Sequence, residues 1–262
     1  MKILFIGDIV AKPGRAAVKE VLPDLIKKEK IDLVIANIEN LAHGKGATSE
    51  TIEEVREAGV DIMTSGNHIC FRGEYAESLS NDPTILRPAN YPSDTPGFGF
   101  TYAETKKGKV LIINLLGRQW MDQAVEEPYR TIDAILLDQV EKEKPDATIV
   151  DYHAEATSEK LALGWFLDGR VSAVFGTHTH IPSCDTMILP KSTAYVTDVG
   201  MTGAIHSVLG VKPDIIIKRQ KDPYPVKFEW VETGPKAFRS CLIEVGRGGK
   251  AKSIERIDFE LG

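Results

Sequence analysis

Short apolar segments alternate with amphipathic segments along the first three quarters of the chain, and this alternation constrains the fold more than any other feature. Near-continuous apolar runs rich in β-branched residues predict strands that are buried on both faces of a sheet. These runs occupy residues 2–7, 33–37, 60–64, 110–115, 148–152, 171–176 and 194–197. Helical periodicity predicts helices over residues 15–29, 49–58, 129–143 and 158–166. Strands and helices in this order favour parallel βαβ units.

Two of these helices have residues at their start that can serve as N-caps. Thr48 or Ser49 is expected to cap the second helix, and Thr157 or Ser158 the fourth.

The last third of the chain has a different pattern. Residues 226–231, 240–245 and 254–261 are predicted strands separated by glycine and polar turns. We expect them to be antiparallel and to close a second sheet of the same domain. The proline- and glycine-rich stretch 81–99 is predicted to be a loop. The sequence therefore predicts one α/β domain over residues 1–262, with mostly parallel central strands and helices outside.

Composition excludes several classes of function. The formal net charge is −6 and the sequence has no long basic run, which argues against binding duplex nucleic acid. The apolar N-terminal run is broken by Asp8, and no stretch approaches the ~20 apolar residues of a membrane span. We therefore expect a cytoplasmic protein that does not associate with membranes. A small anionic substrate remains compatible if bound metal reverses the local charge.

The three cysteines, Cys70, Cys184 and Cys241, are widely spaced. An odd, scattered set predicts neither a disulfide framework nor a thiolate zinc site. Cys70 lies two residues after a histidine, so a nucleophilic role has to be considered. A small apolar packing role is the commoner explanation for such a residue.

Polar residues follow five of the predicted strands, at the edge where open α/β sheets bind their ligands. The five clusters are Gly7-Asp8, Asn37-Ile38-Glu39-Asn40, Gly66-Asn67-His68, Asp151-Tyr152-His153 and Gly176-Thr177-His178-Thr179-His180. Carboxylate, amide and imidazole groups are ligands for manganese, iron and zinc. A lone aspartate or Asn-His pair after a strand is commonly a cap, turn or loop feature, whereas the Gly-x-His-x-His pattern is more specific for metal. Their combination in this order predicts a metal site.

Two of the candidate histidines, His178 and His180, are two residues apart. On an extended strand their side chains would point to opposite faces. A turn directly after the strand would direct both imidazoles towards one site, and we expect such a turn here.

The motifs resemble those of the calcineurin-like metallophosphoesterase superfamily over nearly the whole chain. Longer runs resemble its YmdB-like phosphodiesterase branch, namely Ile38-Glu39-Asn40, Arg87-Pro88-Ala89-Asn90, residues 153–160 and residues 198–203. The resemblance implies a metallophosphoesterase-type layered fold and two bound metal ions. It also implies hydrolysis of 2′,3′-cyclic nucleotides to 3′-nucleotides, with a small anionic nucleotide as the substrate.

The sequence departs from the superfamily pattern at the first two motifs. The first motif usually has a histidine two residues after the aspartate, but Val10 stands there and cannot bind metal. The second motif is usually Gly-Asp, but here it is Glu39-Asn40. We infer that Asn40 supplies the missing ligand and that Glu39 replaces the bridging aspartate. An amide oxygen in place of an imidazole favours iron or manganese over zinc.

The superfamily's roles, transferred position by position, imply two metal sites that share Glu39. The first site would consist of Asp8, Glu39, Asn40 and His180, and the second of Glu39, Asn67, His153 and His178. A bridging carboxylate would hold the ions the ~3.5–4 Å apart that is typical of two-metal hydrolases. The resemblance implies in-line attack on phosphorus by a hydroxide held between the ions. His68 is expected to act as the general acid, not as a ligand.

Four further residues have two explanations each. Glu155 either orients a metal-binding imidazole or begins the following helix. Arg87 and Asn90 either contact substrate or support their loop. His43, which has glycines close to it in sequence, could approach a phosphate or lie free on a loop.

Two other functions remain open. One is a broad phosphomonoesterase or protein phosphatase, and the other is a regulatory protein that senses a nucleotide at the metal centre. The presence of every proposed ligand and of His68 argues against a decayed site. The sequence does not determine the native metal, the physiological substrate or whether the chain forms a homo-oligomer.

Overall fold

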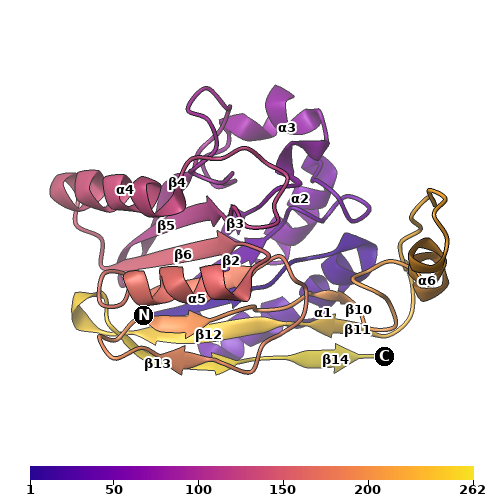
Figure 1. The fold of residues 1–262 in the computed structure, drawn as a ribbon. Helices are drawn as coiled ribbons and strands as arrows, with labels where there is room; N and C mark the ends of the chain where they lie inside the picture. Colours follow the sequence, from indigo (N-terminus) through magenta and orange to yellow (C-terminus); the bar gives the residue numbers. More distant parts are fainter.

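The computed structural model describes residues 1–262, apart from the side chains of residues 140 and 141. Two large mixed sheets pack against each other, with helices outside them (Figure 1). This arrangement confirms the predicted α/β class, the mostly parallel central strands and the outer helices. The expectation of one domain over residues 1–262 stays a prediction.

The first large sheet has the strand order β13-β12-β1-β2-β3. Its parallel centre consists of β1 (Lys2–Ile6), β2 (Leu33–Asn37) and β3 (Ile62–Thr64). Two antiparallel strands extend it, β12 (Ser240–Val245) beside β1 and β13 (Ala251–Arg256) at the edge. The N-terminal strand therefore lies between β2 and a strand from near the end of the chain.

The second large sheet has the order β4-β5-β6-β7-β9-β8. Its four parallel strands are β5 (Gly108–Leu116), β6 (Ala147–His153), β7 (Ala173–Thr177) and β9 (Ala194–Val196). Antiparallel strands form its edges, β4 (Phe100–Thr105) and β8 (Met187–Ile188). Neither edge strand was predicted from the sequence.

The C-terminal strands are antiparallel as expected, but they do not form one sheet of their own. β12 and β13 belong to the first large sheet. A small third sheet contains β10 (Gly203–Ala204), β11 (Lys236–Phe238) and β14 (Phe259–Leu261). The predicted strand over 254–261 is divided, because β13 ends at Arg256 and β14 begins at Phe259.

The predicted strand over residues 226–231 is wrong. This segment forms only an isolated bridge between Trp230 and Val211. Its alternating apolar residues have another explanation, because the Trp230 ring lies so close to Gly44 that a Cβ there would come within 2.2 Å of it. Trp230 is thus apolar because it packs on a loop, not because it belongs to a strand.

The helices lie on the outer faces of the two sheets. α1 (Ala11–Glu29) and α2 (Ser49–Glu57) pack on the first sheet, and α4 (Pro128–Lys142) and α5 (Thr157–Phe166) on the second. Thr48 caps α2 through a reciprocal capping box with Thr51. The predicted caps of α5, Thr157 or Ser158, are wrong, since the cap position is Ala156 and makes no side-chain hydrogen bond.

The remaining helices are short or peripheral. They are α3 (Glu74–Glu77), α6 (Pro213–Lys221) and the 3₁₀ turns η1 (Ile69–Phe71), η2 (Leu79–Asn81) and η3 (Arg247–Gly249). α6 stands apart from the body of the molecule (Figure 1) and contains no buried residue. Among the described helices, none combines the length and apolarity that crossing a bilayer requires.

The interior between the two sheets is apolar. Buried side chains of β1, β2 and β12 pack there against those of β5, β6 and β7. Phe5 and Phe175 stack across this layer with ring centroids 4.5 Å apart. The close packing fixes the two sheets relative to each other, and the carboxyl ends of β1, β2, β3, β6 and β7 carry the candidate ligands.

Candidate metal centre

Side chains from both large sheets meet at the carboxyl ends of their parallel strands. Asp8 follows β1, Glu39 and Asn40 follow β2, and Asn67 follows β3. His153 ends β6, while His178 and His180 follow β7. All seven lie in one connected cluster. Most of the cluster is shielded from solvent, since Asp8, Glu39, Asn40 and His153 are buried and the side chain of His180 is 11% exposed.

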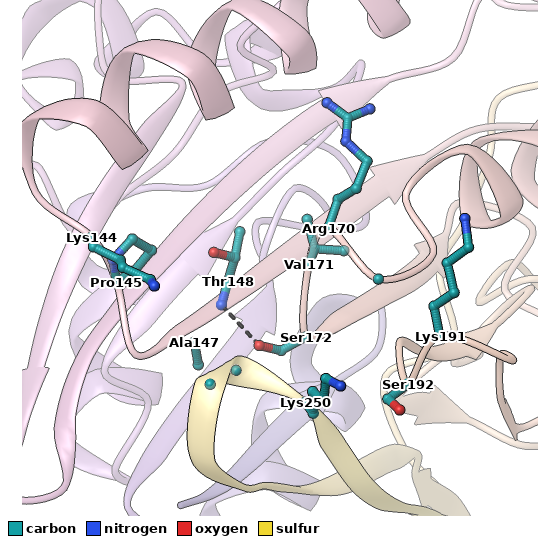
Figure 2. A pocket seen from close by; sticks show the side chains of 13 residues that line it. Lys144, Pro145, Ala147, Thr148, Arg170, Val171, Ser172, Lys191, Ser192 and Lys250 are labelled. Atoms are coloured by element: carbon teal, nitrogen blue, oxygen red, sulfur yellow. Dashed lines mark hydrogen bonds between the residues drawn. The ribbon is translucent and has the colours of Figure 1, made fainter.

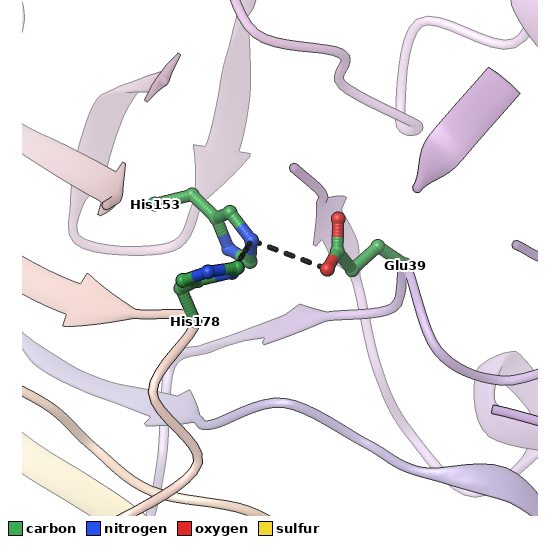
Figure 3. Close-up of side chains that lie close together, drawn as sticks. All are labelled: Glu39, His153 and His178. Atoms are coloured by element: carbon green, nitrogen blue, oxygen red, sulfur yellow. Dashed lines mark hydrogen bonds and ion pairs between the residues drawn. The ribbon is translucent and has the colours of Figure 1, made fainter. Parts of the chain in front are cut away.

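The candidate ligands of the second site surround one nitrogen of His153. Its Nε2 lies 3.1 Å from Oε1 of Glu39, 3.1 Å from Oδ1 of Asn67 and 3.0 Å from Nδ1 of His178. Figure 3 shows the two imidazoles and the Glu39 carboxylate facing one another. One ligand atom from each of Glu39, His153 and His178 lies within 4.8 Å of the others, a separation that a single ion can span.

The candidate ligands of the first site continue from the same carboxylate. Nδ2 of Asn40 donates to Oε1 of Glu39 at 3.3 Å and lies 3.4 Å from Nε2 of His180. Nε2 of His180 is in turn 3.7 Å from Oδ1 of Asp8. The structure therefore brings together all seven residues that the sequence proposed as ligands, although Asn40 presents its nitrogen to His180.

A hydrogen-bonded chain behind His153 determines which ring nitrogen is free. Nδ1 of His153 donates to Oγ1 of Thr177 at 2.9 Å, and that hydroxyl donates to Oδ1 of Asp151 at 2.7 Å. Asn37 donates to the other oxygen of Asp151 at 3.0 Å. This arrangement places a proton on Nδ1 and directs Nε2 towards the centre, as in many metal-binding histidines. Sequence reasoning did not identify Thr177 or Asp151 as supports.

The backbone after β7 forms the expected turn. His178 and His180 have φ angles of 101° and 64°, values that non-glycine residues adopt only at a cost. The Asp198 carboxylate supports the turn by accepting hydrogen bonds from N and Oγ1 of Thr179, at 3.1 and 2.7 Å. Lys160 pairs with the same carboxylate at 2.7 Å, and both side chains are 1% exposed.

A glycine makes room for the His153 ring. A Cβ on Gly66 would lie 2.2 Å from Cδ2 of His153, closer than any real contact. The glycine of the Gly66-Asn67-His68 motif is therefore required by the close approach of the β3 loop to β6.

The electrostatics of the cluster are those of several ionisable groups buried together. Burial and the nearby carboxylates of Asp198 and Glu39 raise the pKa of Asp8 to about 8. Burial opposes ionisation of Glu39, but the charge of His153 and the hydrogen bond from it outweigh that effect and hold the Glu39 pKa well below its usual range. Burial lowers the pKa of His153, yet Glu39 and Asp8 reverse this and raise it to about 9.

The protonated forms of the other two imidazoles, those of His178 and His180, are disfavoured. Burial, with the charge of His153, lowers the pKa of His178 to about 3. Burial also lowers the pKa of His180 to about 4. Both are therefore neutral near pH 7, the form in which an imidazole binds metal.

These residues fit metal ions. Oδ1 of Asp8 and Nδ1 of His180 are buried without a hydrogen-bond partner among the described residues, and a buried carboxylate oxygen left unpaired is costly. The donors are oxygen and imidazole nitrogen, the set that manganese and iron accept. An ion close to Asp8 would remove the cost of that unpaired oxygen.

His68 borders the cluster. Its Nδ1 lies 3.0 Å from Oδ1 of Asn40 and 3.2 Å from Oε1 of Glu39, and its backbone N–H donates to Oε2 of Glu39 at 2.8 Å. The side chain is 25% exposed. It is therefore positioned between the cluster and solvent.

The structure distinguishes between the two explanations for several other residues. Oε2 of Glu155 is 3.1 Å from Nε2 of His178, so this carboxylate holds the imidazole on the side away from His153. Arg87 donates to the carbonyls of Pro88 and Thr95 and supports its own loop.

Three other residues considered from the sequence, Asn90, His43 and Cys70, make no described contact with the cluster. Asn90 hydrogen-bonds to backbone atoms of Leu116 and Glu126, so it also supports a loop. His43 is exposed on the loop before α2. Burial raises the pKa of the Cys70 thiol, which disfavours the thiolate that a nucleophilic role would need.

A separate cavity of about 180 Å³ lies at the opposite, amino-terminal ends of β6 and β7 (Figure 2). Its lining includes Thr148, Ser172, Lys191 and Lys250. None of the candidate ligands contributes to it. The chemistry proposed below therefore does not involve this cavity.

Comparisons with known proteins agree with one another. The profile of the YmdB-like protein family matches residues 4–257. The chain is 45% identical over 258 residues to the 2′,3′-cyclic-nucleotide 2′-phosphodiesterase of Bacillus subtilis strain 168, covering 98% of this chain and 96% of that protein.

Two solved structures share the whole fold. A hypothetical protein from Thermus thermophilus superposes with a TM-score of 0.92 at 43% identity and covers 99% of both chains. A structure described as a novel phosphatase from Mycoplasma pneumoniae gives a TM-score of 0.93 at 36% identity, over 99% of this chain and 93% of that one. The protein therefore belongs to the family of YmdB-like proteins.

Proposed function

We propose that this protein is a phosphodiesterase that uses two metal ions, iron or manganese, to open 2′,3′-cyclic nucleotides to 3′-nucleotides. The observation that carries the proposal is the connected cluster of seven oxygen and nitrogen donors, with Oδ1 of Asp8 buried and unpaired inside it. The name of the Bacillus subtilis relative supports the same reaction.

Two sites that share Glu39 would hold the ions. Oε1 of Glu39 contacts His153, assigned to the second site, and Asn40, assigned to the first, at 3.1 and 3.3 Å. This shared oxygen supports a bridging role. When bound, the ions would supply Lewis acidity for the phosphoryl oxygens and lower the pKa of the attacking water.

Ligation by Asn40 requires a change in the orientation of its amide. Its Nδ2 faces Glu39 and His180, while Oδ1 faces Nδ1 of His68. Half a rotation about the Cβ–Cγ bond exchanges the two atoms without changing the shape of the group. The amide nitrogen would then face Nδ1 of His68, which also lies 3.2 Å from Oε1 of Glu39 and can donate a proton to that carboxylate.

His68 is the proposed general acid. When water attacks phosphorus and the bond to O2′ breaks, that oxygen leaves as a poor alkoxide unless it is protonated. When His68 carries a proton on both nitrogens, it can transfer the Nε2 proton to this oxygen and return to a neutral imidazole, because the ring lies at the border of the cluster and is partly exposed.

The charge at the centre favours an anionic substrate. Two divalent ions against the carboxylates of Asp8 and Glu39 leave the site positive, although the chain as a whole carries a formal charge of −6. A small cyclic phosphodiester can therefore be attracted without an extended basic surface.

The proposal is tested by turnover of 2′,3′-cyclic AMP by protein stripped of metal and then reloaded with Mn²⁺ or Fe²⁺. We expect no turnover in the stripped protein, recovery after reloading, and 3′-AMP as the product. Binding of the nucleotide without turnover at full metal occupancy would instead indicate the regulatory function. Preference for phosphomonoesters would indicate a phosphatase.

A further inference from the structure

A cavity of about 430 Å³ adjoins the proposed metal centre. Asn67, Cys70, Phe71, Tyr91, Pro92, Thr95, Gln123 and Ala124 line it. Asn67 is also a candidate ligand of the second site, so the cavity begins where the ligand cluster ends. Its volume falls within the ~300–1,000 Å³ of small-molecule sites.

Two aromatic side chains contribute to its walls. Phe71 on η1 is 61% exposed, which is unusual for a phenylalanine, and the ammonium of Lys45 lies 5.4 Å from its ring centroid. Tyr91 is 9% exposed, and its hydroxyl donates to the carbonyl of Gly66 at 3.3 Å. Through Gly66, the Tyr91 wall is attached to the loop that carries Asn67.

One polar atom of the lining lacks a partner. Oε1 of Gln123 is buried and accepts no hydrogen bond from the described residues. A buried acceptor in this state is costly, and a ligand N–H can satisfy it. Flat apolar walls beside an unpaired amide oxygen are features that bind a nucleobase, whose faces stack and whose edge carries N–H groups.

We propose that this cavity binds the base of the nucleotide, with Phe71 as the stacking residue and Gln123 as the hydrogen-bonding residue. This inference rests on the proposed function and extends it, because it predicts a preference for nucleotides over other cyclic phosphates. Tyr91 would form the fixed wall, and the phosphate would lie at the ligand cluster beside Asn67.

The test compares two substrates that contain the same five-membered cyclic phosphate, 2′,3′-cyclic AMP and glycerol 1,2-cyclic phosphate. Phe71→Ala should reduce kcat/KM for the nucleotide mainly through KM. The reduction should be roughly ten-fold or more beyond any reduction for the glycerol compound, which has no base to stack. Gln123→Ala should act in the same direction.

Trp165→Ala is the matched control, because Trp165 is an aromatic residue on α5 that is 55% exposed and does not line the cavity. It should affect neither substrate. Equal fractional losses on the two substrates in Phe71→Ala, at unchanged metal content, would overturn the assignment of the base site.

A binding measurement separates this proposal from the proposed function. Adenosine 3′-phosphate can be titrated into the Mn²⁺-loaded protein by calorimetry whether or not the protein turns over either cyclic phosphate. Weaker binding to Phe71→Ala, with binding of glycerol phosphate less affected, supports the base site. Unchanged nucleotide binding in both Phe71→Ala and Gln123→Ala overturns the base site. Absence of turnover alone overturns only the proposed function.

Discussion

The carboxylate of Asp198 lies 2.7 Å from Oγ1 of Thr179, the residue between the two candidate ligands His178 and His180. The same oxygen of Asp198 is 2.7 Å from the buried ammonium of Lys160. The turn that carries the two histidines, whose backbones have positive φ, is thus supported by a buried carboxylate that is paired with Lys160. This contact explains how a turn with unfavourable backbone geometry can be maintained.

Asp198→Ala should therefore reduce stability and metal binding together. The substitution leaves Lys160 buried without its counter-charge and removes the hydrogen bonds to Thr179, at a cost of about 3–5 kcal/mol in the free energy of unfolding. Urea denaturation in the presence of EDTA measures this cost without metal. Glu229→Gln, which breaks an exposed pair with Lys212, serves as the control and should have no measurable effect.

Glu39→Gln should lose more activity and more metal than Asn40→Ala. The carboxylate contributes negative charge and contacts members of both proposed sites, whereas the amide belongs to one. We expect a loss above the ~10–100-fold seen for residues that only support ligands. Elemental analysis alongside turnover checks this, and full occupancy of both sites in Glu39→Gln would contradict the bridging role.

His68→Ala should retain both ions yet lose about 10²–10⁴-fold in turnover of a 2′,3′-cyclic nucleotide. The loss should be much smaller for a phosphodiester whose leaving group is p-nitrophenolate, because that group departs without a proton. If His68 only steadies a phosphate oxygen, both substrates should lose activity alike, and that result would remove the general-acid assignment.

Glu155→Gln should weaken metal binding by about ten-fold, at the lower end of the range for residues that support ligands, because its side chain is 46% exposed. The amide can still contact Nε2 of His178 but has lost the negative charge that makes the imidazole a better donor. A Co²⁺ titration followed by its visible spectrum reports the second site directly. An unchanged Co²⁺ affinity would indicate that Glu155 acts only at the start of α5.

Metal binding should release protons near neutral pH. In the ion-free protein the pKa of His153 is raised to about 9 and that of Asp8 to about 8, so both hold a proton at pH 7. An ion must displace these protons, and its apparent affinity should rise as pH increases from about 6.5 to about 8.5. Calorimetry with Mn²⁺ in two buffers of different ionisation enthalpy measures the release, and identical heats in both buffers would contradict it.

Much of the fold could be predicted because its central strands are buried on both faces. The run at residues 33–37 is apolar apart from its last residue and matches β2 without any difference in its ends. β4 is largely half-buried and lies at an edge, so its sequence lacks that signature. The sequence around Trp230 alternates as a strand would, yet the Trp230 ring packs on the loop at Gly44, and local pattern alone does not separate the two cases.

The candidate ligands could be located for a different reason. They lie at strand ends, where topology alone brings them to one edge of the sheet. The residues that hold the ligands in place could not be located from the sequence. The contact of Thr177 with His153, for example, depends on the register between β6 and β7, which places these two residues opposite each other. The Asp198 carboxylate likewise reaches Thr179 only after β9 and β7 have paired.

The proposed ligands come from both large sheets, Asp8, Glu39, Asn40 and Asn67 from one and the three histidines from the other. Ions bound among them would join regions of the chain that are as far apart in sequence as residues 8 and 180. The centre can then assemble only after the two sheets have docked. A newly synthesised molecule would have no activity until the two sheets have docked, so binding of metal would indicate that folding is complete.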